Sequence, residues 1–186
     1  MIPPALHPQA PEAPAAGAPL AAQPTPFPGA TQALRSPDGR WLLVHAPAQP
    51  GDAVLKGAHG LFLLDLKGGG TSRLLTYARH ADACFSPDGR HLLLTEWTAA
   101  DAATVRLYRL DGAPVRLSLD RWIGGHLKGT QVSSLQALGW SDARTFRLQW
   151  WGYSGEAERK SFRRGLEVRL DDGVREVYPR EGEGAR

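Results

Sequence analysis

Residues 36–40 read Ser-Pro-Asp-Gly-Arg, and the same five residues return at positions 86–90, fifty residues later. Each copy leads directly into an apolar run, Trp-Leu-Leu-Val at 41–44 and His-Leu-Leu-Leu at 91–94. A weaker third copy, Ser-Asp-Ala-Arg at 141–144, follows after a further 55 residues and lacks the proline and the glycine. A period of this length indicates a repeat architecture.

Each repeat predicts four short strands. Proline pre-sets φ at the second position of a turn and glycine takes the left-handed position, so Ser-Pro-Asp-Gly predicts a tight turn between two strands. Two more runs with strand-like alternation follow each copy, and a glycine turn separates them. The sequence therefore predicts an all-β fold of three four-stranded antiparallel meanders at about 31–76, 80–118 and 134–178, without a helix.

The two ends of the chain differ from this pattern. Residues 1–29 are rich in proline and alanine and have too few large apolar side chains to offset the entropy of ordering, which predicts a disordered tail or linker. Residues 30–180 are the predicted blade domain, and residues 181–186 are predicted to fray. No stretch approaches the roughly 20 apolar residues that a transmembrane helix needs. The first residues do not resemble a signal peptide, so we expect either a cytoplasmic protein or a chain from which a leader has been removed.

Composition excludes several classes of partner and cofactor. The formal net charge is only +3, and basic residues alternate with acidic ones, so we expect no nucleic-acid partner. The lone Cys84 allows neither an internal disulfide nor a cysteine-based metal site. No histidines have ligand spacing, and no glycine-rich segment leads into a helix as a nucleotide loop does. We therefore expect no metal and no other cofactor.

Units of about fifty residues in which Ser-Pro-Asp-Gly-Arg precedes an apolar strand resemble the WD40-like (PD40) repeats of the TolB type. The resemblance covers about residues 31–178 and implies a partial β-propeller. Propellers have about four to eight blades around a channel, so three blades leave two flanks uncovered. Because large apolar flanks are unstable in water, we expect two chains to close a six-bladed ring, or a single chain to pack into a compact wedge.

The resemblance implies a binding platform or a substrate gate, and no Gly-x-Ser-x-Gly nucleophile elbow is present. We therefore expect no enzyme but a protein- or peptide-binding or scaffold module, in the periplasm or cell envelope if the chain is exported. The alternative is a small-ligand or glycan binder that uses the channel or an aromatic surface. A hydrolase-like enzyme that uses His80 and Asp82 is the third hypothesis.

Candidate binding residues come first from a long segment at about 119–133, which the sequence predicts to be irregular. It contains Arg121, Trp122, His126 and Lys128. An aromatic and an arginine in a long loop are typical of binding hot spots. The alternative is that Trp122 fills the gap between two blades.

Two further groups of candidates lie on predicted strands. Trp150 and Trp151 must point to opposite faces, so one should be core and the other should pack on a neighbour or lie exposed near Tyr153. His80 and Asp82 are two residues apart and share a strand face. A polar channel lining or a hydrogen bond between them is favoured over a metal site.

Overall fold

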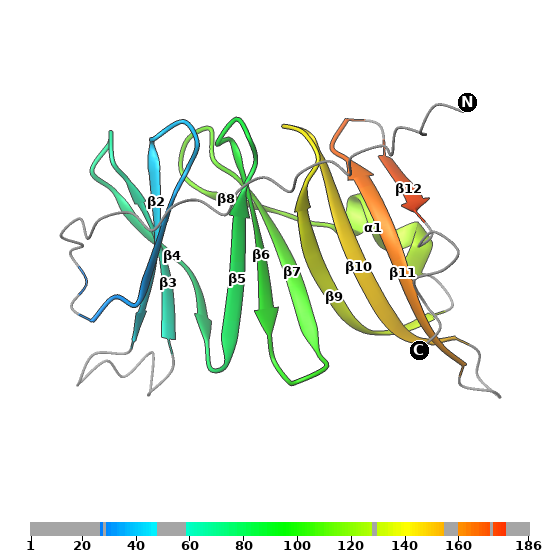
Figure 1. The fold of residues 1–186 in the computed structure, drawn as a ribbon. Coiled ribbons are helices and arrows are strands. Elements are labelled where there is room, and N and C mark those ends of the chain that lie inside the picture. Colours follow the sequence, from blue (N-terminus) through cyan, green and yellow to red (C-terminus); the bar gives the residue numbers. More distant parts are fainter. Residues whose placement is uncertain are drawn as a thin grey trace, which may run out of the picture.

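The computed structural model describes residues 27, 29–47, 59–127, 130–154, 160–171 and 173–177. These residues form three antiparallel four-stranded sheets that stand side by side in chain order (Figure 1). In each sheet the strands follow their order in the sequence, so each is a meander. The predicted all-β fold of three four-stranded blades, a partial β-propeller, is confirmed.

The strands have the following bounds. Blade one contains β1 (Gln32–Arg35), β2 (Trp41–Pro47), β3 (His59–Asp65) and β4 (Thr71–Tyr77). Blade two contains β5 (His80–Phe85), β6 (His91–Trp97), β7 (Ala103–Arg109) and β8 (Val115–Leu117). Blade three contains β9 (Thr130–Trp140), β10 (Thr145–Ser154), β11 (Lys160–Arg169) and β12 (Gly173–Val177). The predicted tail, apart from Phe27 and Gly29, and the predicted frayed end at 181–186 lie outside the described residues.

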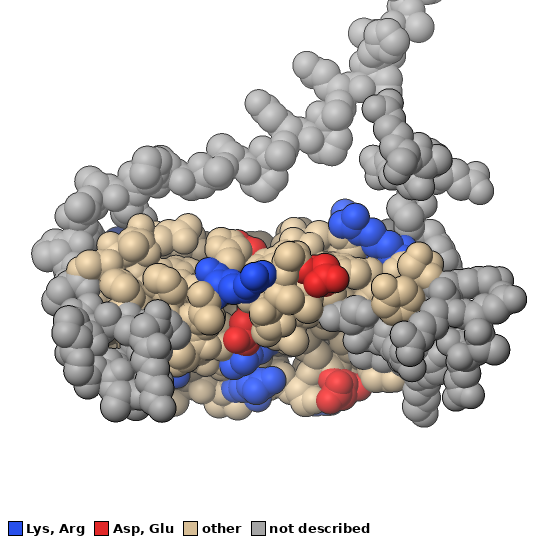
Figure 2. All heavy atoms as spheres, turned by 90° about the horizontal axis from the view of Figure 1, so that it is seen from below, with Lys and Arg blue, Asp and Glu red and all other residues tan. Residues whose placement is uncertain are grey.

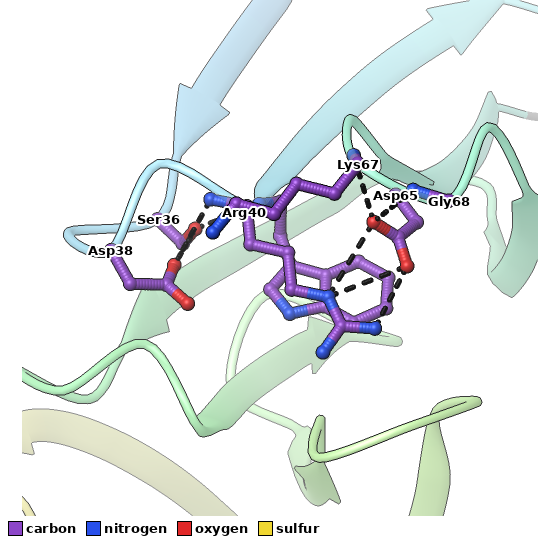
Figure 3. A network of polar contacts seen from close by, with 7 residues as sticks. Ser36, Asp38, Arg40, Asp65, Lys67 and Gly68 are labelled. Atoms are coloured by element: carbon purple, nitrogen blue, oxygen red, sulfur yellow. Dashed lines mark hydrogen bonds and ion pairs between the residues drawn. The ribbon is translucent and has the colours of Figure 1, made fainter.

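The repeated turn is held by its own side chains. In blade one the Ser36 hydroxyl donates to Asp38 at 2.5 Å and accepts from the Trp41 backbone N–H at 2.8 Å (Figure 3). The Asp38 carboxylate also accepts from the Arg40 backbone N–H. Blade two repeats all three bonds, with Ser86 and Asp88 in the equivalent places. Ser36 and Ser86 are thus buried turn residues.

Apolar side chains fill the two spaces between blades. Between blades one and two lies a cluster that includes Leu43, Leu61, Leu63, Leu92 and Leu94, all buried. A second cluster between blades two and three is described below with the helix that joins it. Strand alternation explains both clusters, because every second residue of a strand points to the same face.

The outer flanks of the blade row differ from each other. On the outer face of blade one, Val44 is fully buried, and Phe27 stacks on Phe62 with ring centroids 4.4 Å apart. On blade three the residues that alternate with buried Phe146 and Leu148 are polar. Arg147 pairs with Glu167 at 3.4 Å across the sheet. Among the described residues, Phe27 thus covers part of the outer face of blade one, and the outer face of blade three carries an ion pair.

One element contradicts the sequence prediction. The segment after β8 was predicted to be irregular, but Asp120–Leu127 form the helix α1, and β9 begins at Thr130. The backbone N–H groups of Trp122 and Ile123 both donate to the Leu119 carbonyl, which starts the first turn. Leu119 and Ile123, four residues apart, are buried with Trp150 in the cluster between blades two and three. Tertiary packing thus decides this helix, since its two glycines disfavour it.

Candidate functional site

Two tryptophans from different blades meet where β6 ends and β7 begins, at the lower end of the sheets in Figure 1. The Trp97 and Trp151 rings are 6.2 Å apart at an angle of 37°. The Trp97 indole N–H donates to Asp82 at 3.0 Å, and the Trp151 indole N–H donates to the Asp101 carbonyl at 3.1 Å. Both rings are half-buried and are therefore fixed yet accessible.

A histidine and a carboxylate extend this pair of rings. His80 Nε2 lies 2.7 Å from one oxygen of Asp82, whose other oxygen accepts from Trp97. The side chains of His80 and Asp82 remain 63% and 54% exposed. Arg163 lies over the Trp151 ring at 5.8 Å and also donates to the Gln149 side chain. We call His80, Asp82, Trp97, Trp151 and Arg163 the tryptophan strip.

Contacts between blades two and three give the strip a rigid base. The backbone N–H of Ala103 donates to the buried Ser134 hydroxyl at 2.5 Å, and Ser134 pairs in register with Trp151. Nearby, the Ala137 N–H donates to the buried hydroxyl of Thr95. Because these bonds join the two sheets directly, the rings from the two blades keep their relative position.

The chemistry beside the strip does not favour a nucleophile. Cys84 lines a cavity of about 160 Å³ together with Asp82 and Leu138. Burial, and secondarily the Asp82 charge, raises the pKa of the Cys84 thiol to about 11. The thiolate is the reactive form, so this cysteine is inert at neutral pH. The His80 and Asp82 pair is suited to hydrogen bonding with a ligand at the surface.

The predicted residues of the strands come together as follows. Trp150 is fully buried in the core and Trp151 packs on Trp97, as strand alternation predicted. Tyr153, two residues further along β10, is 45% exposed. His80 and Asp82 lie in the same strip as Trp151. The sequence did not reveal this, because the two groups are far apart along the chain.

The predicted residues of the 119–133 segment lie elsewhere. Trp122 is half-buried against blade three, its indole N–H donates to the Leu170 carbonyl at 3.2 Å, and Arg121 lies over its ring. These contacts pack Trp122 on blade three, and a binding role for this segment stays a prediction. His126 belongs to α1 but its side chain, like all of Lys128, is outside the described residues.

Sequence reasoning missed Trp97 and Arg163. Trp97 ends an apolar strand and looks like a core residue, and Arg163 is one of many basic residues that alternate with acidic ones. The antiparallel register pairs His80 with Trp97 and Trp151 with Arg163. A sequence-based prediction of the strand pairing would have placed each next to a predicted candidate.

The charges on the face of the molecule seen from below are mixed. Figure 2 shows the molecule from below, and on that face basic and acidic side chains of the described residues are interspersed. No large patch of one sign forms in the parts shown in colour. No helix of the described chain is long and apolar enough to cross a membrane.

Comparison with known proteins gives similarity at the level of solved structures. The chain is similar to TolB from Acinetobacter baumannii, with 18% identity, 82% of this chain and 33% of that chain covered, and a TM-score of 0.41. It is also similar to the AtxE2 isopeptidase, with 15% identity, 82% and 30% covered, and a TM-score of 0.42. The chain thus spans about a third of either protein. No family model and no curated protein sequence matches it.

Proposed function

We propose that this chain is a non-enzymatic module that binds a protein or peptide through the tryptophan strip. The observation that supports this most is the pairing of Trp97 and Trp151 from two blades, each held by its indole N–H and each partly exposed. Aromatic rings and arginine are the side chains most enriched in binding hot spots. Rings that are already fixed lose little conformational entropy when a partner packs on them.

The chemistry of the strip suggests the kind of segment it would take. An apolar or aromatic side chain of the partner would pack on the two rings. A hydrogen-bond donor or cation beside it would meet the exposed Asp82 carboxylate, which lies between His80 and the Trp97 indole. Arg163 on the other side would suit a carbonyl or a carboxylate.

A peptide library displayed on phage and selected on the immobilised full chain tests this proposal. We expect enriched peptides to bind the unaltered chain, and Trp97→Ala and Trp151→Ala each to weaken them about tenfold or more, the size of a hot-spot loss. Leu66→Ala removes an exposed apolar side chain from a turn of blade one and serves as the control. Circular dichroism must show that all variants are folded. If the enriched peptides bind a chain that carries both Trp97→Ala and Trp151→Ala as tightly as the unaltered chain, the role of the strip is refuted. A selection that enriches no peptide would refute it as well.

Glycan binding is the second candidate, because partly exposed indole rings next to an exposed carboxylate also suit a sugar ring and its hydroxyl groups. A glycan array probed with the same variants separates the two. Glycan binding by the unaltered chain that is lost in Trp151→Ala, together with a peptide selection that enriches no peptide, would favour glycan binding over peptide binding.

A further inference from the structure

A cavity of about 460 Å³ lies between blades two and three, beside the segment that joins β8 to α1. Its walls come from the start of β7, from residues 116–120, from Ile123 of α1 and from β9. Ligand pockets commonly measure roughly 300–1,000 Å³. The cavity can therefore take a small organic ligand. None of the residues of the tryptophan strip lines it.

The floor of the cavity is apolar and already assembled. Val105, Leu119 and Ile123 are buried members of the core between the two blades, and half-buried Leu117 and Leu135 complete the floor. Because strands and a packed helix hold these side chains, an apolar group could enter without opening the core. Such a pre-formed site has a low ordering cost on binding.

Two opposite charges also line the cavity. Arg116 of β8 is exposed and forms no ion pair with any described residue, whereas Arg106 and Arg109 on neighbouring β7 are paired with acidic side chains. Asp120, the first residue of α1, is exposed, and its carboxylate accepts a long hydrogen bond of 3.4 Å from the Ser118 hydroxyl. The lining therefore combines a cation, an anion and an apolar floor.

We propose that this cavity binds a short apolar peptide with free termini, about the size of a dipeptide. Its side chains would pack on the apolar floor, its α-carboxylate would bind Arg116 and its α-ammonium would bind Asp120. Both termini are mostly charged at neutral pH. A plain carboxylic acid would be repelled by Asp120 and a plain amine by Arg116, so a zwitterion complements this lining best.

Calorimetric titration of the full chain tests the proposal with three probes: the dipeptide Leu-Leu, its N-acetyl form and its C-terminal amide. We expect Leu-Leu to bind and each blocked form to bind severalfold more weakly, since each block removes one charge-assisted contact at a solvent-exposed side chain. Arg116→Gln should lose the preference for the free carboxylate over the amide. Asp120→Asn should lose the preference for the free amine over the acetyl form.

Two controls make the outcome decisive. Arg121→Gln changes an exposed charge on α1 outside the cavity and should bind like the unaltered chain. Trp151→Ala should also leave Leu-Leu binding unchanged, which separates this cavity from the tryptophan strip. The proposal is overturned if the folded chain does not bind Leu-Leu at millimolar concentration. It is equally overturned if both charge variants, folded by circular dichroism, keep the full preference for free termini.

Discussion

The repeated turns of blades one and two lie close together at single residues. Gly89 has a φ of +72°, and a Cβ added there would lie 2.6 Å from the Asp38 carboxylate of blade one. Gly39 occupies the same place in the first turn with a φ of +70° and nothing within 4 Å. Gly89 is therefore required by both its conformation and the close approach of Asp38, and Gly39 by its conformation alone.

This pair of glycines gives a matched test. A non-glycine residue in the left-handed region costs about 1–2 kcal/mol, so Gly39→Ala should lower the free energy of unfolding by about that amount. Gly89→Ala should cost at least about 1 kcal/mol more, because Asp38 must move and strain the bonds it accepts in its own turn. Urea unfolding measures both variants. Equal losses would contradict the contact between the two turns.

A titrating residue of the same region gives the chain a specific acid sensitivity. The hydrogen bond from Arg40, helped by the Gly68 backbone N–H, lowers the pKa of Asp65 from 3.8 to about 2 (Figure 3). Since the folded-state pKa is below the unfolded one, the stabilisation is complete above about pH 4 and is lost as the pH falls towards 2. Unfolding measured at several pH values should show that the free energy of unfolding falls less steeply over this range in Asp65→Asn than in the unaltered chain. An equally steep loss in the variant would exclude Asp65 as its source.

At the scale of elements, α1 shows packing overriding propensity. Its glycines are unfavourable in a helix, yet Ile123, together with Leu119 just before the helix, is buried in the core between blades two and three. The site at Gly125 is open, with no atom within 4 Å of an added Cβ. The helix propensity of α1 and its packing on the core can therefore be tested by separate substitutions, at Gly125 and at Ile123.

We expect Gly125→Ala to raise the free energy of unfolding by about 0.5–1 kcal/mol, the difference in helix propensity. Ile123→Ala should lower it by about 2–5 kcal/mol, because a buried apolar side chain is lost. Denaturant titration measures both. If Ile123→Ala had no effect, α1 would not be docked on the core.

At the scale of the whole molecule, the question is how three blades remain stable without a closed ring. Phe27 and Ala30 pack on the outer face of blade one, and the described side chains on the outer face of blade three include ion-paired residues. These features reduce the apolar area that a second chain would have to cover. Of the two arrangements that the sequence left open, they favour the single chain.

Light scattering at micromolar concentration should therefore give the molar mass of one chain. Phe27→Ala should then expose apolar surface on blade one, lower stability and promote association. A stable dimer of the unaltered chain would instead support closure of a six-bladed ring, which remains a prediction.

The sequence by itself determined the blades. Their turns and alternating strands are local patterns, and the Ser-Pro-Asp-Gly bonds close within six residues, so the period, the turns and the opposite faces of Trp150 and Trp151 could be read directly. Only the tertiary structure decided the helix α1, whose local propensity is poor and whose stability comes from the core between blades two and three. It also decided the tryptophan strip, because Trp97 and Trp151 are distant in sequence and meet only when two sheets pack face to face.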